Sequence, residues 1–118
     1  MMTNEQAKLA RKYLLAGLAG AFEDAENCPG DDTAGDWDMN RVHGYVTALC
    51  ELGHITEDQF DRFIRLMHHA HYLAQDDNRE EYYGARAAAL EMAREITAVP
   101  RKSRKKTDTS SQKAAAQL

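Results

Sequence analysis

The spacing of apolar residues predicts four amphipathic helices joined by short polar segments. Apolar side chains recur three or four positions apart, the spacing that places them on one face of a helix. Four segments show this spacing: residues 4–26, 39–52, 57–75 and 78–99. Because short connections favour antiparallel neighbours, the expected fold is all-α, a small antiparallel four-helix bundle.

Polar residues with capping ability define where these helices should begin and end. N-cap residues are expected at Thr3, at Asp38, at Thr56, and at Asp77 or Asn78. Thr3 and Thr56 are each followed three residues later by a glutamine, the spacing of a capping box. Gly53 is expected just beyond the second helix, where a positive φ is common.

The first helix carries two apolar stripes, which is more than one small bundle needs. The main stripe consists of Leu14, Leu18, Ala21, Phe22 and Ala25. The second stripe, Leu9, Tyr13, Ala16 and Gly20, lies roughly on the opposite side. Gly17 and Gly20 each cost about 1 kcal/mol relative to alanine inside a helix, so we expect another helix or a partner protein to approach closely there.

The second helix and the loop before it carry further apolar residues. Its expected buried face consists of Met39, Val42, Tyr45, Val46, Leu49 and Leu52. Residues 27–38 contain Pro29, Gly30 and Gly35 and are expected to form an acidic loop. We expect Trp37 to anchor this loop on the bundle, although an exposed tryptophan would instead indicate a binding surface. The candidate contacts with a protein partner are therefore Leu9, Tyr13, Ala16, Gly20 and Trp37.

Three histidines in the segment RLMHHAH suggest a metal or catalytic site. At 100° per residue, however, their directions spread around the third helix instead of converging. His71 is expected at the edge of the core, and His68 and His69 outside it. His68 and His71 could supply at most two ligands, and the remaining candidates are His43 and Cys50 of the second helix and His54 in the turn, in no recognised spacing. We therefore assign no metal ligand, no cofactor and no catalytic residue.

Charge is distributed unevenly along the chain. Residues 100–118 contain six basic residues and one acidic residue, so their formal charge is +5, and residues 1–99 carry −9 of a total of −4. This uneven distribution of charge predicts an acidic helical bundle in residues 1–99 and a disordered basic tail in residues 100–118. Arg101, Lys102, Arg104, Lys105 and Lys106 are the candidate contacts of this tail with nucleic acid or an acidic partner.

Together these patterns favour a non-enzymatic helical regulator or adaptor that binds a protein partner through its acidic bundle. The alternative is a nucleic-acid-associated protein that makes non-specific contacts with its tail, and a third class is a metal-binding helical enzyme. We expect no membrane segment, because no apolar run reaches about 18 residues. A cytoplasmic location is expected from the mixed charges near the start and from only two cysteines. The second apolar stripe leaves homodimerisation open.

Overall fold

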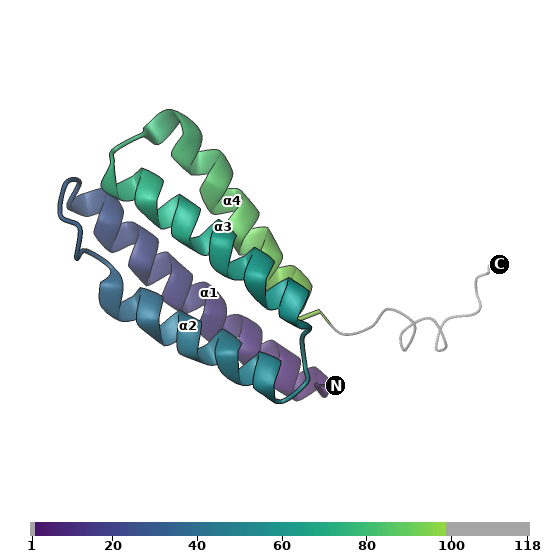
Figure 1. Ribbon diagram of the computed structural model, residues 1–118. Coiled ribbons are helices and arrows are strands. Elements are labelled where there is room, and N and C mark those ends of the chain that lie inside the picture. Colours follow the sequence, from purple (N-terminus) through teal and green to yellow (C-terminus); the bar gives the residue numbers. More distant parts are fainter. Residues whose placement is uncertain (1, 99–118) are drawn as a thin grey trace.

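The computed structural model describes residues 2–98, which form an all-α bundle of four helices (Figure 1). The helices are α1 (Asn4–Asn27), α2 (Asp36–Glu51), α3 (Glu57–Gln75) and α4 (Arg79–Ile96). Neighbours in sequence lie antiparallel, as expected from the short connections. The expected contacts of residues 101–106 lie outside the described residues.

Local sequence signals account for most helix ends. Thr3 and Thr56 form complete capping boxes at the starts of α1 and α3, as predicted. Asn78 is the N-cap of α4, and Asp77 before it adopts a positive φ of 56°. Gly53 follows α2 with a φ of 78°, and the N–H of His54 donates to the carbonyl of Leu49, 2.9 Å away. This arrangement is a Schellman motif, so the prediction for Gly53 is confirmed.

The start of α2 differs from the prediction. The helix begins at Asp36, and its N-cap is Gly35 with a φ of 86°, so the expectation that Asp38 caps it is wrong. A β-carbon at Gly35 would lie 2.5 Å from the carbonyl oxygen of Ala21 and 2.8 Å from Nε2 of His71. Only glycine combines this backbone conformation with so close an approach. The position of α2 is therefore set by contacts with α1 and α3.

The core lies along α1 and α3, which contact each other and both other helices. The predicted main stripe of α1 is buried throughout, as are Phe63, Met67, Ala70 and Leu73 of α3. Within residues 2–98, α2 packs only on α1 and α3 and makes no contact with α4. α2 consequently has a narrower buried face than its sequence suggests, consisting of Met39, Val42 and Val46.

Candidate functional site

The second stripe of α1 lies along the seam with α2. A β-carbon at Gly17 would overlap with Val42, and one at Gly20 with the carboxylate of Asp38. The expected close approach of another helix is therefore confirmed, and Gly20 is partly covered by α2. Leu9 and Tyr13 remain about half exposed and Ala16 is exposed.

Trp37 lies in the first turn of α2, not in a loop, and is 72% exposed. The expectation that it anchors a loop on the bundle is wrong. The guanidinium of Arg41 stacks on its ring at 4.7 Å from the ring centroid, and Arg41 also forms an ion pair with Asp38 at 2.9 Å. These contacts hold Arg41 beside an indole that stays open to solvent.

Leu52 was expected in the core and is 69% exposed, so this prediction is wrong as well. It follows Tyr45 by seven residues, which places the two on the same side of the helix. Tyr45 packs against Tyr13, with 5.7 Å between the ring centroids. We use the name α1–α2 face for the surface made of Leu9, Tyr13 and Ala16 of α1 with Trp37, Arg41, Tyr45 and Leu52 of α2.

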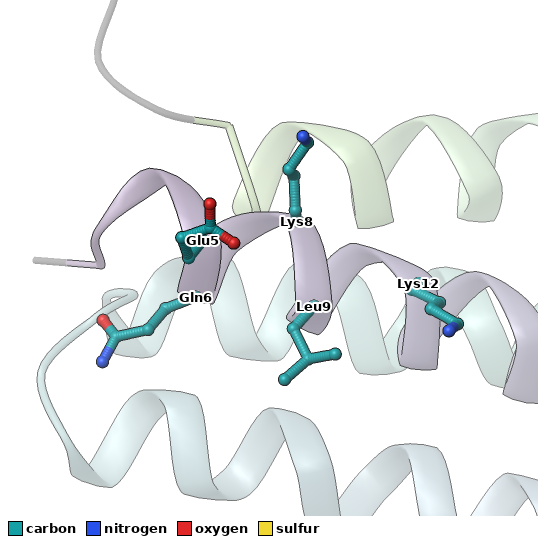
Figure 2. A pocket seen from close by; sticks show the side chains of 5 residues that line it. All are labelled: Glu5, Gln6, Lys8, Leu9 and Lys12. Atoms are coloured by element: carbon teal, nitrogen blue, oxygen red, sulfur yellow. The ribbon is translucent and has the colours of Figure 1, made fainter.

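An open hollow lies at the N-terminal end of this face. Its lining residues all come from the first turns of α1: Glu5, Gln6, Lys8, Leu9 and Lys12 (Figure 2). Leu9 and Lys8 project from opposite sides of α1 in this view, and Lys12 lies further along the helix. One apolar side chain, one amide, one carboxylate and two lysines therefore line this hollow.

The histidines of α3 take the positions predicted for them. His71 is 6% exposed, and His68 and His69 are exposed. The Nε2–H of His71 donates to the carbonyl of Ala34 at 2.7 Å, so this ring ties α3 to the segment before α2. Partial burial lowers the pKa of His68, and the nearby rings of His43 and His71 lower it further. Among residues 2–98, no three histidine, cysteine or acidic side chains come together as metal ligands.

A second polar cluster connects the end of α1 to the start of α4. The carboxylate of Glu26 accepts a hydrogen bond from the buried hydroxyl of Tyr82 and lies 3.5 Å from Arg79 and 3.4 Å from Arg86. Burial and the negative charge of Glu26 raise the pKa of Tyr82. Sequence reasoning did not find this cluster, because Glu26 is more than fifty residues away from its three partners in α4. Since each group has a partner, its evident role is to hold the helices together.

Acidic residues gather at this end of the bundle, where the α1–α2 and α3–α4 connections lie together (Figure 1). The N–H of Gly30 donates to the carbonyl of Gln75, which joins the two connections directly. Eleven acidic residues lie here: Glu23, Asp24, Glu26, Asp31, Asp32, Asp36, Asp38, Asp76, Asp77, Glu80 and Glu81. We call this region the acidic end.

Fold and surface together define a small all-α bundle with an exposed aromatic and aliphatic face and one acidic end. Comparison with protein-family models, curated proteins and solved structures finds no match to this chain. None of the helices in residues 2–98 is long and apolar enough to span a membrane.

Proposed function

We propose that the chain is a small regulator or adaptor that acts by binding another protein and has no catalytic step of its own. The observation that carries this proposal is the α1–α2 face, where Trp37 is 72% and Leu52 69% exposed. Tryptophan, tyrosine and arginine dominate binding energy at protein interfaces. On this face Arg41 stacks on Trp37, and Tyr13 packs against Tyr45.

In this proposal, the acidic charge of the bundle determines which partner proteins bind. Arg41 is the only arginine or lysine of α2, and the acidic end carries many more carboxylates than cations. Such a surface favours basic partners, speeds their association and disfavours acidic ones. Because both cysteines of the chain are free, we place this interaction in the reducing cytoplasm.

The proposal is tested by cross-linking and affinity purification from the cells in which the protein occurs. We expect the wild-type protein to recover a partner protein that Trp37→Ala recovers at least about tenfold less, because an interface anchor is lost. Tyr72→Ala is the matched control, since Tyr72 is 61% exposed on α3, outside the α1–α2 face. Equal recovery by both variants would contradict the proposal.

A second candidate function rests on the charge of residues 100–118. Their formal charge of +5 is sufficient for non-specific, salt-dependent contact with DNA or RNA. Titration of labelled nucleic acid at two salt concentrations measures this contact. Binding that is lost on removal of residues 100–118 and that weakens with salt would favour this function over the first.

A further inference from the structure

We propose that Lys8, Arg11 and Lys12 of α1 bind the phosphate backbone of duplex DNA, together with the basic residues that follow α4. These three side chains are called the basic cluster. The inference rests on the second candidate function, contact of residues 100–118 with nucleic acid, and adds a part of the folded bundle to that contact. It does not involve the α1–α2 face.

The basic cluster differs from most cations of the bundle in having no carboxylate partner. Five arginines of residues 2–98 lie within 4.0 Å of a carboxylate oxygen: Arg41, Arg62, Arg79, Arg86 and Arg94. Among the lysines and arginines in this part of the chain, only Arg65 and the basic cluster form no such ion pair. Lys8 and Lys12 are also exposed, so their charge is available to an anionic ligand.

The basic cluster lies on the side of α1 that faces α4. The guanidinium of Arg11 donates to Oγ1 of Thr97 at 3.2 Å and to the carbonyl of Thr97 at 3.3 Å. At about 100° per residue, Lys8 and Lys12 lie about 60° and 100° around the helix from Arg11. Tyr13, on the α1–α2 face, lies about 160° away from Arg11. The basic cluster and the α1–α2 face are therefore different surfaces of the bundle.

The hydrogen bonds of Arg11 also place the start of the basic segment next to this cluster. Thr97, which accepts them, is fully buried, and Arg101 follows it by four residues. Because consecutive Cα atoms are 3.8 Å apart, the Cα atom of Arg101 lies within about 15 Å of that of Thr97. The +5 charge of residues 100–118 and the basic cluster can therefore contact the same polyanion.

The charges near the basic cluster favour an anionic ligand. Glu5 is the only acidic residue of α1 before Glu23, so this part of α1 carries a formal charge of +2. On the neighbouring α4, the carboxylates of Glu91 and Glu95 are already paired with arginines. Glu23, where the acidic end begins, follows Lys12 by eleven residues, or about 16 Å along the helix axis. This is about twice the Debye length at physiological salt, so repulsion by the acidic end is screened.

Duplex DNA is the polyanion that fits these groups. It carries about one negative charge per 1.7 Å of its axis, so cations spread over a helix and an adjoining segment can each meet a phosphate. Proteins that bind single strands rely on bases stacked on aromatic rings, and residues 100–118 contain no aromatic residue. We therefore expect contacts with phosphates, which carry no sequence information, and not with base edges.

Titration of a labelled DNA duplex with the full chain at several salt concentrations tests the inference. Each phosphate contact adds about 0.9 to the negative slope of log K against log[salt]. The double variant Lys8→Gln, Lys12→Gln should therefore reduce this slope by about 2 and weaken binding to unrelated duplex sequences alike. Arg65→Gln, which removes an unpaired cation from α3, is the matched control and should change neither. Arg11 is left in place, because its loss would also disturb Thr97.

Glu5→Gln provides a test of opposite sign. It should tighten binding, because it removes the carboxylate nearest in sequence to the basic cluster. Circular dichroism confirms that each variant keeps its helices. A salt slope that the double lysine variant leaves unchanged would overturn the inference. Tighter binding to phosphatidylserine vesicles than to DNA, with the same two lysines required, would also overturn it and would indicate an anionic membrane instead.

These outcomes separate the inference from the functions proposed above. Loss of DNA binding when the five basic residues of 101–106 are replaced by glutamine, with no effect of the two lysines, overturns the inference and leaves the second candidate function intact. A full chain that binds no DNA contradicts both. Recovery of a partner protein through Trp37 is measured separately and does not depend on either result.

Discussion

At the scale of single residues, two glycines within helices show opposite roles for the same amino acid. A β-carbon at Gly17 would overlap with Val42 of α2, whereas one at Gly84 in α4 would meet no atom within 4 Å. Gly17 therefore lets two helices approach, and Gly84 mainly lowers the helical propensity of α4. The sequence predicts close approach at Gly17, but only the structure distinguishes the two sites.

Alanine substitutions should separate these two roles. Gly17→Ala is expected to lower the free energy of unfolding by about 1–3 kcal/mol, because α2 must move away from the new methyl group. Gly84→Ala is expected to raise it by about 0.5–1 kcal/mol. Urea denaturation followed by circular dichroism measures both effects. Small and equal changes in the free energy of unfolding would show that α1 and α2 do not pack closely at Gly17.

His68 should make the stability of the protein sensitive to mild acid. Because burial and neighbouring histidines lower its pKa below the ordinary 6.5, the unfolded chain binds a proton at this site more readily than the folded chain. The free energy of unfolding should therefore fall as the pH decreases from about 7.5 through the ordinary histidine pKa. His68→Gln should reduce this fall and His69→Gln, a change of an exposed neighbour, should not. An unaltered profile in His68→Gln would contradict the prediction.

At the scale of helices, the number of helices and their main apolar faces could be predicted from the sequence, but the contacts between the helices could not. The main stripe of α1, the capping boxes and the position of His71 all depend on local spacing, so they were predictable. The start of α2 depends on Gly35 fitting between Ala21 and His71, residues remote in sequence. Leu52 is exposed, and α2 has no contact with α4 within residues 2–98. Trp37 was placed in a loop because the predicted start of this helix, residue 39, lies three residues after its observed start at Asp36. Periodicity places Trp37 opposite the buried face of α2 only when the start of the helix is known, and that start could not be predicted from local sequence.

The Tyr82–Glu26 contact should couple α1 to α4. Tyr82→Phe is expected to lower the free energy of unfolding by about 1.5–3 kcal/mol, because Glu26 loses a buried donor. Tyr72→Phe should change it by less than about 0.5 kcal/mol, since Tyr72 is exposed. Chemical denaturation of both variants measures the difference. A double-mutant cycle with Glu26→Gln should give a coupling well above zero, and additive effects would show that the contact does not join the helices.

At the scale of the whole molecule, the α1–α2 face extends from the acidic end, where Trp37 lies between Asp36 and Asp38, to Leu9 near the start of α1. The acidic end surrounds the α1–α2 and α3–α4 connections, whereas the hollow beside Leu9 lies near the start of α1. Apolar and acidic groups therefore adjoin at the Trp37 end of this face. In our proposal the α1–α2 face supplies the binding energy, and the acidic surface selects which partners approach.

The most direct test of this account is photo-cross-linking in the cells in which the protein occurs. A benzophenone amino acid in place of Trp37 is compared with the same amino acid in place of Tyr72, which is also exposed but lies on α3. We predict covalent adducts with protein from position 37, either a second copy or another chain, and none above background from position 72. An absence of protein adducts at position 37, or equal adducts at both positions, would contradict the claim that the α1–α2 face is the functional surface.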